Sequence, residues 1–289
     1  MTRQERTPFK QDSGAAPSAV VVSLPNAGRS YKNIKQALAD LPEITSSIEN
    51  KTGWKFDLAH VGFEVVTAQQ LQRRCLEDVT RRTGIPSTMP QSFLARSVGD
   101  VLLAAYHRSV VALYLPSERK IVINEERLRG LSQDAVKSTL HHELTHAAQH
   151  QRYPRFLEGI DRLAREQSIY GKHGGDLPVE ERNQRFESSS ERLHARMSLL
   201  EGQAMALQKM YDREAGLHSE IKMGPVEVAL GLTSMLIPGG IAKITQYITG
   251  QALFERIHAL GIKEVNSLFK DPRSVDLLFG RGRQGQKAA

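Results

Sequence analysis

The stretch Leu140–His150, LHHELTHAAQH, contains four of the chain's ten histidines and one glutamate. Within it, His142, Glu143 and His146 form the pattern H-E-x-x-H. If the segment is helical, the two histidines lie one turn apart on the same face, where both imidazoles can bind one metal ion. This requirement constrains the fold more than any other feature of the sequence, because it fixes a helix and the face of it that must meet a metal site.

The residues around this motif predict a helix with a β-hairpin before it. Ser132 is a good N-cap and Asp134 falls in the first turn, so the helix should run from about Gln133 to Gln151 and end before Pro154. Between Ser109 and Asn124, the runs VVALYL and KIVIN are rich in β-branched residues and are separated by PSER, which is typical of a hairpin. The H-E-x-x-H pattern therefore lies in the second half of a helix.

A second long helix is predicted to begin near Glu180, and it carries an unusual carboxylate. Apolar residues recur every three or four positions through SERLHARMSLLEGQAMALQKMY. Glu201 lies four residues after Met197 and four before Met205, so its side chain points along the apolar stripe. Because burying an unpaired carboxylate is unfavourable, Glu201 should be protonated, paired with a cation or bound to a metal.

The third metal ligand distinguishes the subclasses of H-E-x-x-H proteins. The metzincin pattern requires glycine at position 148 and histidine at 152, where this chain has Ala148 and Arg152. A glutamate from a later helix is the other common arrangement, and Glu201 follows His146 by 55 residues. We therefore expect His142, His146 and Glu201 to be the ligands. Four other residues stay open as the third ligand: His194, His150, Asp161 and Glu191.

A centre with three protein ligands leaves one position for water, and zinc lowers the pKa of that water towards neutrality. Glu143 adjoins a ligand in sequence and can accept the proton of the water as it attacks a peptide carbonyl. We therefore expect Zn2+ as the cofactor and Glu143 as the catalytic base. The other two histidines of the stretch, His141 and His150, are expected at the surface or behind the ligands.

Three segments resemble those of a family of bacterial and archaeal zinc metallopeptidases of the gluzincin type. HHELTHAAQHQ is similar to that family's HELTHALQDQ-like helix, LLEGQAMAL to its EGxA-like helix, and YITGQALFERIHALGIKEVNSLFKDPRSVDLLF to its terminal YxxG...F...G...VN.LY..P.S segment. The order and approximate spacing agree, and the likeness extends from about Phe63 to Phe279. The resemblance implies zinc ligands at His142, His146 and Glu201 and a catalytic base at Glu143.

The chain departs from the family pattern at three positions. Ala148 and His150 stand where the family tends to have Leu and Asp, and Arg273 stands where a second proline is usual. None of them belongs to the ligand set, so they bear on substrate preference and not on metal binding.

A donor to the transition-state oxyanion is also expected downstream. The candidates are Tyr247, which matches the family's YxxG tyrosine but can equally be a buried aromatic, Tyr211 and His218.

The formal charge of +7 lies at the two ends of the chain. Residues 1–35 carry +4 and residues 281–289 carry +3, so residues 36–280 are formally neutral. A neutral body has no net basic excess that could follow a phosphate backbone, and no nucleic-acid partner is expected. The basic ends are expected to be solvated, with contact to a membrane surface or a role in export as alternatives.

No segment is expected to span a membrane. The most apolar window, Val226–Ala242, is interrupted by PGG at positions 238–240 before it reaches about 20 apolar residues, so it should form a buried helix. No Sec-type signal sequence is expected near Met1. The single cysteine, Cys75, excludes an internal disulfide and favours a reducing compartment. We therefore expect a cytoplasmic protein, with non-classical export as an alternative.

The expected fold is α+β, mostly helical and zincin-like, with a small β-sheet ahead of the H-E-x-x-H helix. Residues 1–30 should be a disordered basic tail outside the fold, in which only SAVVVSL could form a short strand. Residues 31–280 should form the metallopeptidase domain, whose C-terminal helical part covers about 216–280. Residues 281–289 should be a flexible basic tail.

Two further segments predict the N-terminal elements of this domain. YKNIKQALADLP has helical spacing, and Pro42 should end the helix. FEVVTAQQLQRRCLEDVTRRTG predicts a strand at Phe63–Val66 followed by a helix towards Gly84, with Thr67 and Gln70 placed like a capping box.

These features together predict a zinc-dependent metallopeptidase that hydrolyses peptide bonds in a protein or peptide substrate, with Glu143 as general base. One alternative is a non-catalytic interaction or regulatory protein stabilised by zinc, and another is an exported effector protease. The glutamate favours an enzyme, because a structural zinc site needs closed coordination and no base. The hairpin either presents a strand edge to an extended substrate or is simply buried in the core.

Overall fold

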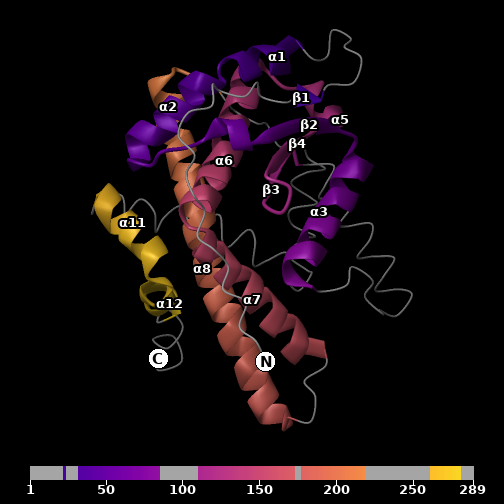
Figure 1. Ribbon diagram of the computed structural model, residues 1–289, viewed down its shortest axis with the longest axis vertical. Helices are drawn as coiled ribbons and strands as arrows, with labels where there is room; N and C mark the ends of the chain where they lie inside the picture. The colour runs from indigo at the N-terminus through magenta and orange to yellow at the C-terminus, as the bar shows by residue number, and fades with distance from the viewer. Residues whose placement is uncertain (1–21, 24–31, 85–109, 173–176, 219–260, 281–289) are drawn as a thin grey trace, which may run out of the picture.

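The computed structural model describes residues 22–23, 32–84, 110–172, 177–218 and 261–280 (Figure 1). Its fold is α+β and mostly helical with one small sheet, as the sequence predicts. Several expectations concern other parts of the chain: the tail 281–289, most of the tail 1–30, the apolar window 226–242 and Tyr247 lie outside the described residues.

The sheet has four strands, β1 (Val22–Ser23), β2 (Gly62–Val66), β3 (Ala112–Leu115) and β4 (Lys120–Asn124). Their order in the sheet is β1-β2-β4-β3. The first two strands and β4 run parallel, whereas β3 pairs antiparallel with β4 and forms one edge. The predicted strand Phe63–Val66 and the predicted hairpin are therefore confirmed.

The first strand corrects the expected start of the fold. Val22 and Ser23 pair in parallel with Phe63 and Glu64 of β2. Part of the segment SAVVVSL, which we expected to lie outside the fold, therefore belongs to the sheet. The physical reason is that β2 is apolar, and an apolar strand is better placed between two hydrogen-bonded neighbours than at an exposed edge.

Helices cover both faces of the sheet, with α3 (Ala68–Thr83) on one face and α6 (Gln133–Arg152) on the other (Figure 1). Because side chains alternate along a strand, neighbouring residues pack on different helices. Leu115 joins a core cluster with Leu71 of α3, while Tyr114 belongs to the main core with Leu144 of α6. The sheet thus holds the hairpin against the helix that carries the H-E-x-x-H pattern.

The start of α3 has the predicted capping box. The Thr67 hydroxyl accepts a hydrogen bond from Gln70 N at 3.2 Å, and Gln70 Oε1 accepts one from Thr67 N at 3.0 Å. Gly84 follows the helix with a φ of 67°, in the left-handed region that suits a residue without a Cβ. Both ends of this helix were therefore readable from local sequence.

The helix predicted in YKNIKQALADLP is α1 (Lys32–Ala39), and a second helix that we did not predict, α2 (Leu41–Thr52), follows it almost at once. Pro42 lies in the first turn of α2 and does not end the helix before it, so this expectation was wrong. Proline is well placed there, because backbone N–H groups in the first turn have no partner within the helix.

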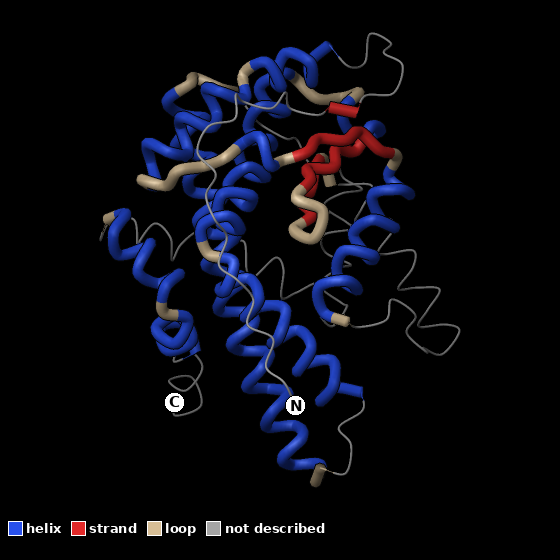
Figure 2. Tube along the Cα trace, in the orientation of Figure 1, coloured by secondary structure: helices blue, strands red, loops and turns tan. Residues whose placement is uncertain are grey.

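Three long helices carry or support the motif residues. Ser132 caps α6 as predicted, and its hydroxyl accepts a hydrogen bond from Ala135 N at 3.2 Å. After α6, Pro154 starts α7 (Pro154–Lys172), a helix that we did not predict. The predicted second long helix is α8 (Val179–Glu214), which runs beside α7 and packs against α6 (Figure 2).

Shorter helical elements complete the described chain. They are η2 (Leu58–His60), α5 (Glu125–Leu128), α11 (Ile262–Lys270) and α12 (Pro272–Gly280). The last two correspond to the end of the predicted C-terminal helical part. Asn266 fixes α11 to the end of α2, because its Oδ1 accepts from Trp54 Nε1 at 2.9 Å and its Nδ2 donates to Thr52 O at 3.0 Å.

The C-terminal helices also bind the two helices that carry the motif residues. The Phe269 ring stacks on Tyr153, just after α6, with ring centroids 4.9 Å apart. The Asp276 carboxylate accepts two hydrogen bonds from the guanidinium of Arg196 on α8, at 3.0 and 2.7 Å. Gly159 of α7 makes room for this guanidinium, since a Cβ there would lie 2.7 Å from Arg196 Nη1. The terminal sequence motif therefore has a structural role.

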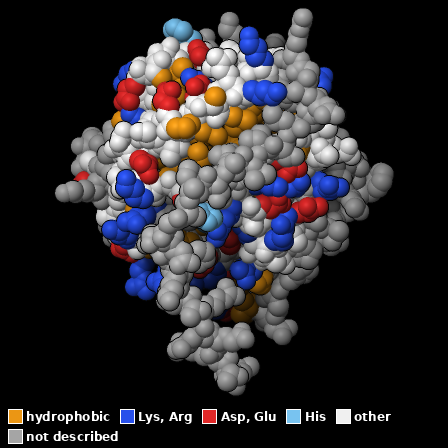
Figure 3. All heavy atoms as spheres, turned by 45° about the horizontal axis from the view of Figure 1, so that its top comes forward, with side chains coloured by type: hydrophobic (Ala, Val, Ile, Leu, Met, Phe, Trp, Pro, Cys, Tyr) orange, Lys and Arg blue, Asp and Glu red, His pale blue; other side chains and the backbone are white. Residues whose placement is uncertain are grey.

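The described surface carries acidic and basic side chains next to one another (Figure 3). Some of them form ion pairs along a helix, such as Arg185 with Glu181 at 2.6 Å and Arg129 with Glu125 at 2.8 Å. Within the described ranges, no helix is both long enough and apolar enough to cross a membrane.

Candidate metal centre

The structure brings the three expected ligands together between α6 and α8. His142 Nε2 and His146 Nε2 lie 3.1 Å apart, and Glu201 Oε2 lies 3.5 Å from each of them. The side chains are 10–18% exposed, so the centre is shielded but can be reached from solvent. Of the histidine, cysteine and acidic residues in the described chain, these three form the group that could hold a metal ion.

The spacing of the three atoms suits a tetrahedral metal ion. Bonds of about 2.0–2.1 Å at tetrahedral angles place neighbouring ligand atoms about 3.3 Å apart, which matches the observed separations. Glu201 Oε2 is buried and makes no hydrogen bond among the described residues. Its nearest polar neighbours are the two imidazoles at 3.5 Å, which is longer than a normal hydrogen bond, and a cation between the three groups would bind this buried oxygen.

The charges of the centre also prepare it for a cation. Burial acts to raise the pKa of Glu201, but the two imidazoles hold it well below its usual range, so this carboxylate is ionised. Burial acts to lower the pKa of His146, but the Glu201 carboxylate outweighs it and raises the pKa to about 9. A metal ion would therefore replace a proton between His146 and Glu201.

Two glutamines orient the ligand imidazoles. Gln208 Oε1 lies 3.1 Å from His142 Nδ1, and Gln149 Oε1 lies 2.8 Å from His146 Nδ1. An amide oxygen can only accept, so each Nδ1 carries a proton and each Nε2 faces the centre, where the metal would take the place of the proton on His146 Nε2. Fixing the tautomer in this way is how residues behind a metal ligand prepare it for binding.

Both glutamines are themselves fixed through their amide nitrogens. Gln149 Nε2 donates to Leu200 O at 3.0 Å and to Gln203 Oε1 at 2.9 Å. Gln208 Nε2 donates to Ser138 Oγ at 2.7 Å, and that hydroxyl donates to Asp212 at 2.8 Å. The sequence prediction missed these residues. A signal was available, because Gln149 lies three residues after His146 and Gln208 lies seven residues after Glu201, on the faces that carry the ligands.

Glu143 lies beside the ligand group and is held by the hairpin. Its Oε2 accepts a hydrogen bond from the backbone N–H of Tyr114, in edge strand β3, at 2.7 Å. Burial raises the pKa of Glu143, although His142 and His146 oppose this effect. The arrangement supplies a carboxylate of increased basicity next to the centre but outside the ligand group.

The other candidates for the third ligand have different roles. His150 Nδ1 lies 2.9 Å from the Tyr114 hydroxyl, and Asp161 pairs with Arg82. His194 and Glu191 do not belong to the group that could share an ion. Of the alternatives that were left open, the geometry therefore favours Glu201.

His141 is neither at the surface nor bonded to a ligand, which corrects our expectation. It is fully buried, its ring stacks on Tyr211 with centroids 4.6 Å apart, and neither ring nitrogen has a hydrogen-bond partner in the described chain. Burial lowers the pKa of His141 to about 3, so the imidazole is neutral. The position is surrounded by the packed interface of α6 and α8, where an uncharged ring is tolerated.

Neither described oxyanion candidate is placed by its contacts at the centre. The Tyr211 hydroxyl donates to Glu43 at 3.1 Å, and the His218 backbone N–H donates to Asp134 at 3.2 Å. The third candidate, Tyr247, lies outside the described residues.

The described chain is thus an α+β protein in which two histidines and one glutamate form a group that could hold a metal ion. Comparison with known proteins found no matching family model, no matching curated protein and no matching solved structure.

Proposed function

We propose that the protein is a zinc metallopeptidase of the gluzincin type, a hydrolase acting on protein or peptide substrates. The observation that carries this proposal is the position of Glu143, a buried carboxylate beside a group of three ligands that it does not join. Three ligands of the kinds found here are typical of catalytic zinc, whereas structural zinc sites use four protein ligands.

When bound, zinc would supply a Lewis acid that polarises the peptide carbonyl and lowers the pKa of a bound water. Glu143 would accept the proton of that water and later deliver it to the leaving amine. Its Oε2 is engaged by Tyr114 N, which leaves Oε1 as the oxygen for the proton. Gln149 and Gln208 would keep the lone pairs of His146 and His142 directed at the metal.

One backbone group on the free edge of β3 is already used to hold Glu143. Tyr114 N–H points away from β4 and donates to Glu143, so it is not available to an extended peptide. The hairpin therefore positions the base, and any substrate pairing along the edge would have to use other backbone groups of β3.

The proposal predicts that Glu143→Gln keeps zinc but loses cleavage. The amide cannot accept the proton of the water, and loss of a general base typically lowers kcat by about 10²–10⁴-fold. The measurement combines metal analysis of the purified protein with cleavage of a peptide library, with and without chelator.

Glu191→Gln is the matched control, because Glu191 is an exposed glutamate on α8 outside the ligand group. It should keep both zinc and activity. If the protein cleaves peptides and Glu143→Gln cleaves them equally well, the role of Glu143 is wrong. If zinc binds but no peptide is cleaved, the non-catalytic zinc protein is the better explanation.

A further inference from the structure

Tyr114, in edge strand β3, makes two hydrogen bonds to the helix that carries the two histidine ligands. Its backbone N–H donates to Glu143 Oε2 at 2.7 Å, and its hydroxyl lies 2.9 Å from His150 Nδ1. The two partners are seven residues apart on α6, so they lie about two turns apart on one face of the helix. In the described chain, both hydrogen bonds between β3 and α6 come from this one residue.

The hydroxyl of Tyr114 meets His150 in a shielded place. Tyr114 is 6% exposed, and its ring packs edge-on against the half-buried imidazole with ring centroids 5.9 Å apart. Burial raises the pKa of Tyr114 and lowers the pKa of His150, so the hydroxyl keeps its proton and the imidazole is neutral. A neutral imidazole and a hydroxyl pair as donor and acceptor, and opening the contact would leave a buried hydroxyl without this partner.

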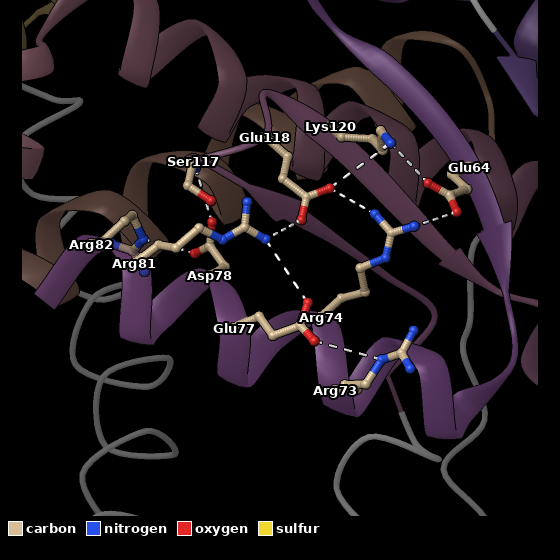
Figure 4. Close-up of polar contacts among 10 residues, drawn as sticks. All are labelled: Glu64, Arg73, Arg74, Glu77, Asp78, Arg81, Arg82, Ser117, Glu118 and Lys120. Atoms are coloured by element: carbon tan, nitrogen blue, oxygen red, sulfur yellow. Dashed lines mark hydrogen bonds and ion pairs between the residues drawn. The ribbon is translucent and has the colours of Figure 1, made fainter. Parts of the chain in front are cut away.

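The turn that follows β3 is anchored separately, on the face of the sheet that α3 covers. Glu118 pairs with Arg74 and Arg81 of α3 at 2.7 Å each, and the Ser117 N–H donates to the Asp78 carboxylate at 2.9 Å (Figure 4). These contacts fix the turn to α3, and none of them reaches α6. They therefore do not set the distance between β3 and the helix with the H-E-x-x-H pattern.

We propose that the hydrogen bond between the Tyr114 hydroxyl and His150 positions Glu143. It holds the backbone of Tyr114 against α6, so that the N–H stays on Glu143 Oε2 and leaves Oε1 for the proton. This inference rests on the proposed function, and it makes His150 a positioning residue. Such a contact matters here because β3 pairs with a neighbour on one side only, and because displacing a catalytic group by about 1 Å can lower a rate by about 100-fold.

Position 150 offers a matched pair of substitutions. Asn has a polar atom where the imidazole has Nδ1, whereas Leu has a methyl group there, so His150→Asn keeps a partner for the hydroxyl and His150→Leu removes it. Leu is the better helix former of the two. If His150 only stabilised α6, Leu would be the better replacement, whereas a positioning role favours Asn. Tyr114→Phe removes the same hydrogen bond from the other side.

We expect His150→Leu and Tyr114→Phe each to lower kcat for peptide cleavage by about 5–20-fold, with KM changed by less than about twofold. Zinc affinity should stay unchanged, because neither residue belongs to the ligand group. His150→Asn should recover most of the loss, and the double variant should lose no more than either single one, since both remove one contact. Arg81→Gln is the control: it loosens the turn on the α3 side and should keep kcat.

Hydrogen exchange of the Tyr114 amide, measured by NMR, tests the contact without a substrate. This N–H points away from β4, so its protection reports its bond to Glu143. The amide should exchange about five- to tenfold faster in His150→Leu than in the unmodified protein. It should exchange at the unmodified rate in His150→Asn and in Arg81→Gln.

An unchanged exchange rate or an unchanged kcat in His150→Leu would overturn the inference, as would equal losses of kcat in His150→Leu and His150→Asn. The exchange measurement separates these outcomes from failure of the proposed function. If no peptide is cleaved but the amide exchanges faster in His150→Leu alone, His150 still holds Glu143 in place and the peptidase assignment falls. If peptides are cleaved and neither kcat nor exchange depends on His150, the peptidase assignment stands and the positioning role falls.

Discussion

At the scale of single residues, the candidate centre holds its histidines with neutral partners. Both Nδ1 atoms face glutamine oxygens, where a carboxylate would have added negative charge behind each imidazole. Of the three ligands, Glu201 is the one that carries a negative charge. The alignment of the imidazoles then depends on amides that are fixed by their own hydrogen bonds, and the most buried of these is Gln149.

Gln149→Met should weaken zinc binding by about 10–100-fold, the usual effect of losing a partner behind a metal ligand. Methionine has a similar shape but cannot accept from His146 Nδ1. Gln149→Glu restores the acceptor and should recover part of the affinity. Competition with a chromophoric chelator measures the affinity. Gln151→Met is the control, because Gln151 is half-buried two residues away and its amide bonds to the Asp57 backbone and not to a ligand histidine; its zinc affinity should match that of the unmodified protein. An unchanged affinity in Gln149→Met would show that His146 does not need this partner.

At the scale of elements, the C-terminal helices hold together parts of the chain that the centre depends on. α12 meets α8 through Asp276 and Arg196, and the arginine side chain is only 4% exposed. Removing the acid leaves a buried guanidinium without its main partner. Breaking a buried pair in this way typically costs about 3–5 kcal/mol.

Asp276→Ala should therefore lower the free energy of unfolding by about 3–5 kcal/mol, as measured by denaturant titration. Glu191→Ala, an exposed change on α8, should stay within about 0.5 kcal/mol of the unmodified protein. A loss below about 1 kcal/mol for Asp276→Ala would mean that Arg196 finds other partners or water, and that the contact does not fix α12.

At the scale of the whole molecule, local sequence patterns predicted the helices and strands well, whereas contacts between residues far apart in the sequence could not be predicted. Ser132 correctly predicted the start of its helix, and the position of Glu201 within an apolar stripe correctly predicted an inward-facing carboxylate. The partner of Gln149, in contrast, is Leu200 O, 51 residues away, and no local pattern encodes that contact. The burial of His141 also depends on a helix that follows much later in the chain. Zinc binding and peptidase activity stay predictions.

The centre joins α6 to α8, so metal should stabilise the molecule as well as the site. A ligand at 100 times its dissociation constant adds about 2.7 kcal/mol to the folded state, which for a chain of this size raises the thermal midpoint by roughly 5–10 °C. Chelator should lower the midpoint by that amount, and added Zn2+ should restore it. Glu201→Ala should abolish the response, because two imidazoles alone leave the ion without its anionic ligand, while Glu191→Ala should retain it. A midpoint that ignores both chelator and zinc would mean that no ion links the two helices in the folded protein.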